Sequence, residues 1–251
     1  MYDIERKEKI LEILRENKSC SVAFLAKTLC FSEATIRRDL NELDREMRLR
    51  KTFGGAVFLE KYGNEVPASL RKNENAEIKA LLAKSASKLI MDGMTIFIAS
   101  STTTEYLLPY LSEHSGLTVI TNSPDIPGKL SGTDVAVYST GGKYLHHSNS
   151  YVGEFARNMI KGVNADLMFF SCRGVGEDGK VTISSTDDDV HRAMMDNSAK
   201  SCLMVDSSKF GKAFPFTITH INDVDVVVTD KAQPCFSEHG NVIVADEKRS
   251  I

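Results

Sequence analysis

The sequence lacks any apolar run close to the roughly 20 residues that a membrane-spanning helix needs. Its N-terminus, MYDIERKEKILEIL, is charged and amphipathic, which is not the pattern of a signal peptide. Basic residues are not in excess, because 31 Lys and Arg stand against 34 Asp and Glu, a formal net charge of -3. Any contact with nucleic acid must therefore come from a local basic patch. We expect a cytoplasmic protein without membrane contact.

Cysteines are few and odd in number, and no two have the close spacing of a zinc or redox motif. They are Cys20, Cys30, Cys172, Cys202 and Cys235. The apolar neighbours of the first four predict buried free thiols in a reducing compartment. The pair His146-His147 with Cys172 does not make a metal site, because adjacent strand residues point apart and no third ligand is apparent. We expect no metal and no other cofactor.

The first 45 residues carry three helical patterns separated by short breaks. Residues 3–17 have an apolar face among charges. Ser21 is placed to cap a second helix, and a tight break follows at Cys30-Phe31. Ser32 is placed to cap a third helix that runs to about Arg45, in which Ile36, Leu40 and Leu43 share one apolar stripe.

The segment RLRKTFGGAVFLE, after the third helix, predicts a hairpin, because two strand-like runs flank Gly54-Gly55. Three short helices and a hairpin make a winged helix-turn-helix, in which the third helix enters the major groove. Arginine suits this role because its planar fork fits both a phosphate and a guanine edge. The candidate DNA-contacting residues are Ser32, Thr35, Arg37, Arg38, Asn41, Arg48, Arg50 and Lys51.

An alternative for Arg37 and Arg38 is a solvated helix face that only balances nearby carboxylates. The acidic residues in question are Asp39, Glu42 and Asp44. The basic hairpin after the helix and the two helices before it favour DNA binding.

The rest of the chain predicts an α/β domain with a mostly parallel sheet. Residues 60–76 are polar without apolar periodicity and are interpreted as a linker, between a DNA-binding domain at 1–59 and a second domain at 77–251. Short apolar runs are expected as strands at 95–99, 117–121, 135–139, 165–171, 201–206, 224–230 and 241–246. Helical patterns lie between several of them, near 77–91, 104–112, 151–162 and 187–200. Continuous apolar strands separated by helices predict a sheet covered on both faces.

The stretch SVAFLAKTLCFSEATIRRDLNELDREMRLRKTFGGAV resembles the N-terminal signature of DeoR-family transcriptional repressors. The matching core is Ser32, Glu33, Thr35, Ile36, Arg37, Arg38, Asp39, Leu40 and Leu43, with Gly54, Gly55 and Ala56 closing the wing. Residues 77–246 resemble the family's C-terminal domain, which is related in fold to ribose-5-phosphate isomerase. The resemblance implies a non-enzymatic domain that binds an effector, typically a phosphorylated sugar or a related metabolite.

Loops after the expected strands supply candidate effector-binding residues. ASSTTTEYL places Ser100, Ser101, Thr102, Thr103 and Thr104 at a helix start, where hydroxyls and backbone N–H groups can cradle a phosphate. Helix capping alone explains one or two of them.

Later loops add more candidates, because loops at the carboxyl ends of strands meet at one edge of an α/β sheet. TNSPD adds Asn122 and Ser123, and STGGK adds Gly141 and Gly142, for which simple turn chemistry is an equal alternative. The family resemblance adds Asp187 in STDDDVHRAMM and Lys209 in DSSKFG, where a lysine at a strand end suits a phosphate.

The sequence departs from the family pattern at several positions. The family usually has glycine at Met47, arginine at Lys51 and histidine at Phe53, all in or next to the wing. In the effector loops it often has aspartate at Ala99, glycine at Ser101 and asparagine at Arg173. Arg173 can recruit an extra anionic group, so we expect an effector that differs from the family's commonest ones.

Two functions follow from these patterns. The first is a repressor that binds double-stranded operator DNA as a homodimer or higher homo-oligomer and is relieved by a phosphorylated sugar or similar metabolite. The second is a sugar-phosphate isomerase with an accessory N-terminal domain. It needs a general base, for which Asp187, Asp188, Glu177 and Asp178 are the nominees.

Overall fold

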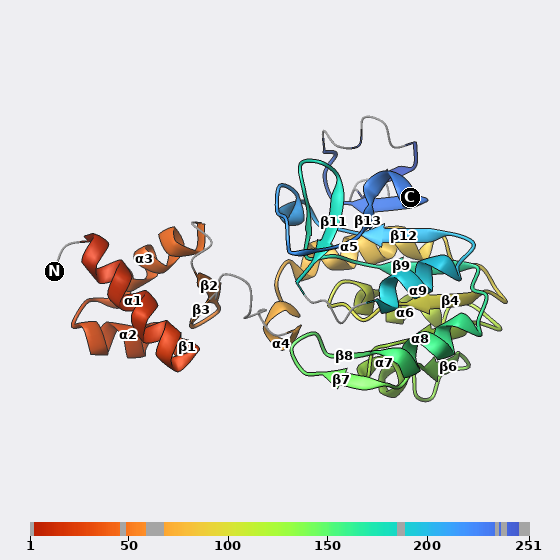
Figure 1. The fold of residues 1–251 in the computed structure, drawn as a ribbon, viewed down its shortest axis with the longest axis horizontal. Coiled ribbons are helices and arrows are strands. Elements are labelled where there is room, and N and C mark those ends of the chain that lie inside the picture. Colours follow the sequence, from red (N-terminus) through yellow and green to blue (C-terminus); the bar gives the residue numbers. More distant parts are fainter. Residues whose placement is uncertain are drawn as a thin grey trace. The chain divides into compact units, whose positions relative to one another are not determined.

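The chain forms two compact units, Met1–Val66 and Pro67–Ile251 (Figure 1). The computed structural model describes residues 3–45, 49–58, 68–184, 189–233, 236 and 240–245. No helix in these ranges is long and apolar enough to cross a membrane. The boundaries 1–59, 60–76 and 77–251 stay a prediction, and within the expected linker residues 68–71 form a helix.

The N-terminal unit has three helices and a three-stranded antiparallel sheet of order β1-β3-β2. Its elements are α1 (Asp3–Asn17), β1 (Ser19–Ser21), α2 (Val22–Leu29), α3 (Glu33–Arg45), β2 (Leu49–Thr52) and β3 (Gly55–Phe58). Both predicted caps are present: the Ser21 hydroxyl accepts from Phe24 N at 3.1 Å, and the Ser32 hydroxyl accepts from Thr35 N at 3.2 Å. The three helices and the hairpin are those that the sequence predicts.

The hairpin β2–β3 is fixed against the helices by its glycines. A Cβ on Gly55 would lie 2.0 Å from the carbonyl oxygen of Cys20 on β1, so only glycine allows this close approach. The carbonyl of Gly54 accepts a 2.8 Å hydrogen bond from the N–H of Val22, the first residue of α2. The wing therefore has one defined position on the domain.

The prediction that the cysteines are buried is wrong for Cys30, which is exposed, and holds only in part for Cys20, which is half-buried. Cys30 ends α2 in the left-handed conformation, with φ 58°, and its N–H donates to Ala26 O. That backbone turn points the side chain away from the core although its sequence neighbours are apolar. Cys172 and Cys202 are buried, and Cys235 lies outside the described residues.

A seven-stranded parallel sheet of order β15-β14-β12-β9-β4-β5-β6 is the centre of the C-terminal unit. Its strands are β4 (Thr95–Ile98), β5 (Thr118–Thr121), β6 (Ala136–Ser139), β9 (Leu167–Phe170), β12 (Ser201–Met204), β14 (Val226–Thr229) and β15 (Val242–Val244). The helical elements are α4 (Ala68–Arg71), α5 (Ala76–Ser87), η1 (Thr104–Leu107), α6 (Leu108–Leu111), α7 (Asp125–Lys129), α8 (Glu154–Lys161), α9 (Val190–Asp196), η2 (Ser207–Lys209) and η3 (Ile221–Asp223). All seven strands fall inside the seven predicted runs.

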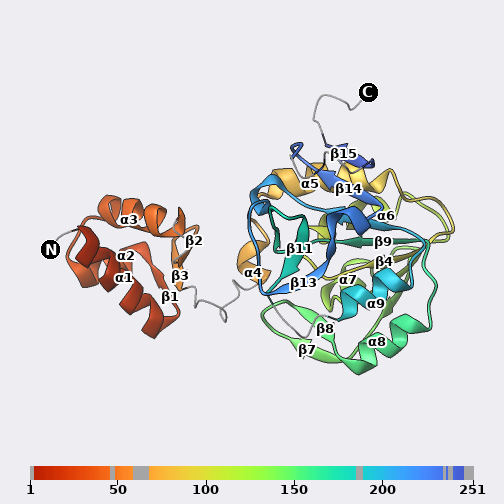
Figure 2. The same ribbon diagram turned by 45° about the horizontal axis from the view of Figure 1, so that its top comes forward.

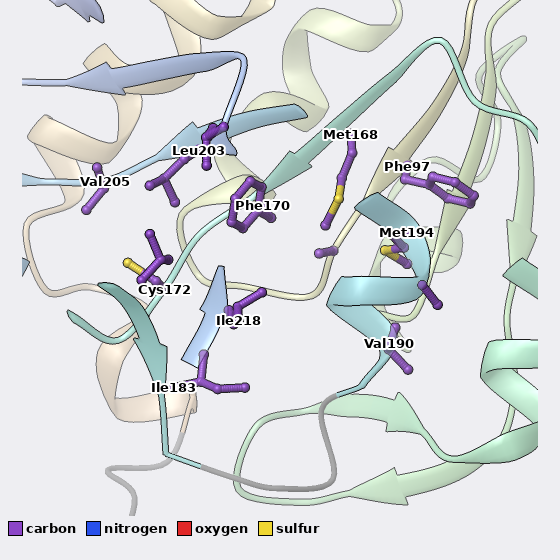
Figure 3. Close-up of a cluster of buried hydrophobic side chains, with 14 of the residues drawn as sticks. Phe97, Met168, Phe170, Cys172, Ile183, Val190, Met194, Leu203, Val205 and Ile218 are labelled. Atoms are coloured by element: carbon purple, nitrogen blue, oxygen red, sulfur yellow. The ribbon is translucent and has the colours of Figure 1, made fainter. Parts of the chain in front are cut away.

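Each central strand is apolar on both faces because both faces are covered. On β4, Phe97 packs into one core, whereas Ile96 and Ile98 pack into the other. The Phe97 core also holds Phe170, Leu203 and the apolar side of α9 (Figure 3). The apolar side of α8 packs into the same core. The Ile96 core holds the apolar sides of α5, η1 and α6, on the opposite side of the sheet (Figure 2).

Five shorter strands of this unit, among its described residues, were not predicted as such. They are the hairpin β7 (Lys143–Leu145)–β8 (Ser150–Val152) and the antiparallel sheet of β10 (Gly174–Val175), β11 (Lys180–Ile183) and β13 (Phe216–His220). Residues 150–152 pair as β8, so the helix expected at 151–162 begins only at Glu154, after Gly153 at φ 88°. The expected helix at 104–112 begins as a 3-10 turn.

Candidate functional site

The exposed face of α3 carries the predicted DNA-contacting residues of the helix. Ile36, Leu40 and Leu43 are 0% exposed, which fixes the rotation of α3 about its own axis. Arg37, Arg38 and Asn41 are exposed, as are Ser32 before the helix and, in part, Thr35. The hydroxyls of Ser32 and Thr35 lie 2.9 Å apart, so these two groups also hold the first turn together.

Arg37 and Arg38 differ in their partners. The Arg37 Nη2 atom donates to Glu33 Oε2 at 2.8 Å, in an exposed pair one turn apart on the helix. No side-chain partner is found for Arg38 within the described residues. The three carboxylates of the alternative interpretation are engaged elsewhere: Asp39 with Arg6, Glu42 with Lys7, and Asp44 with Lys51 N and Arg50. Arg38 is therefore the more available of the two arginines.

The wing lies against the C-terminal half of α3. Lys51 Nζ contacts Asn41 Oδ1, and Lys51 N donates to Asp44 Oδ1 at 3.1 Å. Arg50 Nη1 lies 3.9 Å from the same carboxylate oxygen. The basic side chains of β2 are thus continuous with the exposed face of α3. Arg48, the remaining wing candidate, lies outside the described residues.

A buried ion pair positions α3 on the domain. Arg6 of α1 donates through Nε and Nη2 to the two oxygens of Asp39, at 2.5 and 2.9 Å, and both residues are buried. The guanidinium also lies 4.8 Å from the ring centre of Phe31, which precedes α3. The sequence interpretation missed this pair. The available signal was that Asp39 falls three residues after Ile36, inside the apolar stripe.

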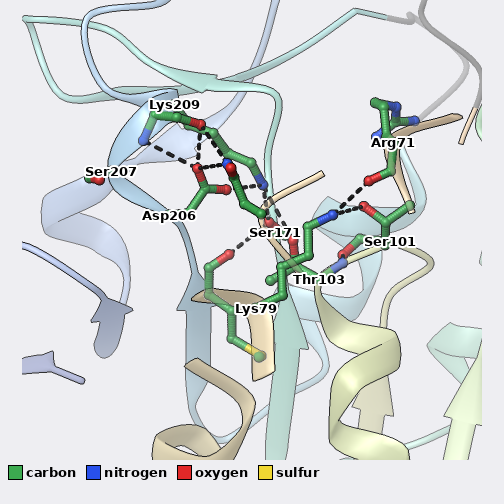
Figure 4. A network of polar contacts seen from close by, with 12 residues as sticks. Arg71, Lys79, Ser101, Thr103, Ser171, Asp206, Ser207 and Lys209 are labelled. Carbon is green, nitrogen blue, oxygen red and sulfur yellow. Dashed lines mark hydrogen bonds and ion pairs between the residues drawn. The ribbon is translucent and has the colours of Figure 1, made fainter. Parts of the chain in front are cut away.

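A second constellation lies at the carboxyl ends of three adjacent strands, β12, β9 and β4. Lys209, in η2 after β12, donates to the hydroxyls of Ser171 at 2.9 Å and Thr103 at 3.4 Å, and lies 3.6 Å from Asp206 Oδ2 (Figure 4). Lys79, on α5, donates to the Thr102 hydroxyl at 3.2 Å. Two lysine ammonium groups thus contact neighbouring hydroxyls of one loop.

The hydroxyl groups of residues 100–104, in the segment after β4, fall into two classes according to their hydrogen-bond partners. The Ser101 hydroxyl accepts from Thr103 N and Thr104 N, both at 3.0 Å, while the Ser100 and Thr104 hydroxyls donate to the carbonyls of Asn149 and Ala99. Capping and loop closure therefore explain these three. Thr102 and Thr103 differ, because their hydroxyls contact lysines.

The remaining loop candidates lie farther along the sheet edge. Asn122, which is 0% exposed, accepts from Ser100 N at 2.7 Å and donates to Tyr151 O at 3.1 Å, and Ser123 is equally buried. Both the oxygen and the nitrogen of the Asn122 side-chain amide therefore hold the loop in place. In the loop after β6, two strands from β4, Gly142 has φ 112°, and a Cβ there would lie 2.6 Å from Val152 O, which favours the turn interpretation for Gly141-Gly142.

The Lys209 ammonium is buried among charges of both signs. Burial is the main reason that its pKa is lowered, the charges of Arg173 and Arg71 lower the pKa further, and the charge of Asp206 opposes them. Asp206 is the buried counter-charge. Burial alone would raise its pKa, but Lys209, hydrogen bonds from Ser208, and Lys79 outweigh burial and lower the pKa of Asp206. Asp187 lies outside the described residues.

Burial, followed by the charge of Lys209, lowers the pKa of Lys79 to about 8. Its charge is therefore present below pH 8 and lost as the pH rises through that value. We expect the affinity for inorganic sulfate, whose own charge is constant in this range, to fall by up to about tenfold per pH unit above 8. Isothermal titration from pH 6.5 to 9.5 measures this. In Lys79→Met the plot of sulfate affinity against pH should show no change of slope near pH 8. A change of slope that persists in this variant would assign the titration to another group.

Lys79 was absent from the predicted site. It is 3% exposed and shares one side of α5 with Leu82, Ala83 and Ala86. A lysine at i, with apolar residues at i+3, i+4 and i+7, was the available signal, because a charge on an apolar stripe needs buried partners.

The described residues contain no group of three or more His, Cys, Asp and Glu side chains arranged to hold a metal ion. Burial raises the pKa of the Cys172 thiol to about 11, so it is a neutral thiol beside Lys209. Asp178, a nominee for an isomerase base, pairs instead with Lys180 at 2.7 Å on the β10–β11 hairpin.

Two family models match the chain: a DeoR-like helix-turn-helix domain over residues 6–62 and the DeoR C-terminal sensor domain over residues 74–231. The transcriptional repressor AccR of Agrobacterium fabrum is 32% identical over 90% of this chain and 89% of its own. The HTH-type transcriptional regulator YulB of Bacillus subtilis, which is uncharacterized, is 33% identical over 92% and 90%. The L-fucose operon activator of Escherichia coli is 28% identical over 91% and 95%.

Ribose 5-phosphate isomerase A of Methanocaldococcus jannaschii is similar over 55% of each chain, with 18% identity and a TM-score of 0.40. The relatives that match along nearly the whole chain are regulators, which decides against the isomerase alternative. A DNA-binding winged helix-turn-helix followed by a small-molecule sensor domain, matched in both parts, places this chain in the DeoR family of transcriptional regulators.

Proposed function

We propose that this regulator reads its operator with α3 in the major groove and with the wing on the neighbouring backbone. The observation that carries the proposal is the orientation of α3, whose apolar stripe is fully buried while Arg38 faces solvent without a partner among the described residues. The proposed contacts are Ser32, Thr35, Arg37, Arg38, Asn41, Arg48, Arg50 and Lys51. The smaller polar groups set the register on phosphates, and the arginines reach base edges or phosphates.

We further propose that the effector carries an anionic group, as a phosphorylated sugar does, and that Lys79, Lys209, Thr102 and Thr103 bind it. Among the described residues, Asp206 is the buried carboxylate near the two ammonium groups, and Glu74 adds a second, half-buried one near Lys79. Arg71 and Arg173 add positive charge to that of the two lysines, which leaves positive charge to be neutralised. Arg173 supplies a further cation at the same edge. The remaining predicted residues, Ser100, Ser101, Thr104, Asn122, Ser123, Gly141, Gly142 and Asp187, support the loops or contact the rest of the effector.

The protein is proposed to act in the cytoplasm as a repressor, as a homodimer or a higher homo-oligomer. Paired half-sites in DNA match a two-fold protein, which supports the oligomer. Relief of repression by the effector requires that effector and DNA affinities be coupled.

Mobility-shift titration of the promoter upstream of the gene, at fixed salt, tests the DNA-binding proposal. Arg38→Ala is expected to weaken binding by about 1–3 kcal/mol, the value of one bidentate base contact. Arg37→Ala should cost less, because Arg37 already pairs with Glu33. Lys9→Ala, on the exposed side of α1, removes the same charge and serves as the control. If Arg38→Ala binds no more weakly than Lys9→Ala, α3 does not read the operator.

A further inference from the structure

All three N–H donors of the Lys79 ammonium group have acceptors within the domain. A lysine ammonium has three N–H groups. Those of Lys79 meet three acceptors: Arg71 O at 2.7 Å (Figure 4), Thr102 Oγ1 at 3.2 Å and Lys72 O at 3.5 Å. An anion that accepts a hydrogen bond from Lys79 must therefore displace one of these oxygens.

Two of the three acceptors belong to the chain that leads to the DNA-binding unit. Arg71 ends α4 and Lys72 follows it, and residues 59–67 join α4 to the wing strand β3 in the sequence. The same segment meets the site at a second point, where Asn75 Nδ2 donates to Asp206 at 3.2 Å and to the Ser208 hydroxyl at 3.3 Å. Both contacts thus attach residues 71–75 to groups within the proposed anion site.

An incoming anion competes for the weaker of these contacts first. The 3.5 Å contact to Lys72 O is long, and this carbonyl also accepts from Tyr106 Oη at 3.4 Å. An anion draws the ammonium toward Thr102 and Lys209, because a charge-assisted bond to an anion is stronger than a bond to a neutral carbonyl. When the hydrogen bonds from Lys79 to Arg71 O and Lys72 O are lost, the end of α4 loses a contact that holds it on the domain.

We infer that Lys79 is both a ligand of the effector's anionic group and a latch, which exchanges the carbonyls of Arg71 and Lys72 for that anion and thereby releases the segment 68–75, which follows the DNA-binding domain in the sequence. This inference rests on the proposed anion site. The two binding equilibria are linked through the arrangement of this segment. The factor by which the anion changes the affinity for operator DNA therefore equals the factor by which operator DNA changes the affinity for the anion.

Hydrogen-exchange mass spectrometry of the full chain tests the latch. We expect saturating inorganic phosphate to speed amide exchange in residues 68–79 of the wild type, with the central sheet unchanged. Lys79→Met removes the donors and should show the faster exchange without phosphate. Lys84→Met, on the exposed side of the same helix, is the matched control and should behave as the wild type.

The outcomes separate the two proposals. If phosphate gives no thermal shift with the wild type, the anion site fails, yet the comparison of Lys79→Met with Lys84→Met still tests the latch. If phosphate binds but residues 68–79 exchange at the same rate in all states, the latch is wrong and the anion site stands. Equal exchange of Lys79→Met and Lys84→Met overturns the latch in either case.

A separate observation concerns the tip of the wing. The side chain of Phe53 is fully exposed at the turn between β2 and β3. The turn is rigid, because Gly54 O is bonded to Val22 N and Gly55 abuts Cys20. Arg50 and Lys51 on the preceding strand bring cations to the same hairpin. An apolar ring beside cations matches the minor groove of DNA, where Phe wedges open a base step between two phosphate backbones.

We propose that Phe53 inserts into a minor-groove base step beside the segment read by α3. With 2-aminopurine placed at successive steps of the footprinted promoter, binding of the wild type should raise fluorescence at one step in each half-site. Phe53→Ala should abolish this signal and weaken binding about tenfold or more, as expected when a phenyl group is no longer buried. Phe155→Ala, an equally apolar exposed site on α8, is the control. Binding by Phe53→Ala at wild-type strength, or no fluorescent step with the wild type, overturns the proposal.

Discussion

Replacing Asp39 with alanine is expected to destabilise the N-terminal unit by about 3–5 kcal/mol, because it leaves the Arg6 guanidinium buried without its counter-charge. A loss of this size is comparable with the whole stability of a small domain. Hydrogen exchange of the full chain measures it. We expect α1, α2 and α3 to lose protection while the seven-stranded sheet keeps it. Operator binding should fall with the folded fraction.

Glu33→Ala is the control for this prediction. Glu33 is also an acidic residue of α3 paired with an arginine, but the pair is exposed, so its removal should cost about 0–1 kcal/mol. The double variant Arg6→Met with Asp39→Leu should regain much of the stability, since apolar groups replace both charges. Equal protection in Asp39→Ala and Glu33→Ala would mean that the pair does not hold α3 in place.

Lys209→Met is expected to remove most of the response to the effector. Lys209 contacts Ser171, Thr103 and Asp206 at the centre of the proposed anion site, and its side chain is 18% exposed. Loss of one charge-assisted hydrogen bond costs about 1.5–3 kcal/mol, so the affinity for inorganic phosphate should fall at least about tenfold. Isothermal titration measures this directly. The same variant allows pentose and hexose phosphates to be screened for effectors that depend on this lysine.

Lys180→Met is the matched control, because Lys180 is an exposed lysine of the same domain that pairs with Asp178. Its phosphate affinity should equal that of the wild type. Should Lys209→Met and Lys180→Met bind phosphate equally, the anion site lies elsewhere on the sheet edge. Operator binding in the absence of effector is the internal reference for both variants.

The helices and strands that carry the fold were predictable because their patterns are local. The stripe of Ile36, Leu40 and Leu43 predicts α3 and its rotation, and the seven apolar runs predict the parallel sheet. The β10-β11-β13 sheet was missed, because β10 has only two residues and because β11 pairs with β13 across a long stretch of sequence.

The contacts of the two sites were less predictable, since burial of a charge depends on residues distant in the chain. Arg6 meets Asp39 across 33 positions, and Thr102 meets Lys79 across 23. In Lys79 and Asp39 a charge interrupts an apolar stripe, a pattern that the sequence contains but that does not identify the partner. The placement of Lys209 at a strand end came from the family resemblance, and its contacts came from the structure.

The Arg6–Asp39 pair also predicts how the domain behaves in salt. Ions screen exposed charges strongly and buried pairs little, so the contribution of this pair to the position of α3 on the domain should be almost independent of ionic strength. Binding to DNA, in contrast, releases counterions and weakens steeply as salt rises. High salt is therefore expected to dissociate the protein from its operator without changing the position of α3 on the domain. Binding should then recover, without refolding of the domain, when the salt concentration is lowered.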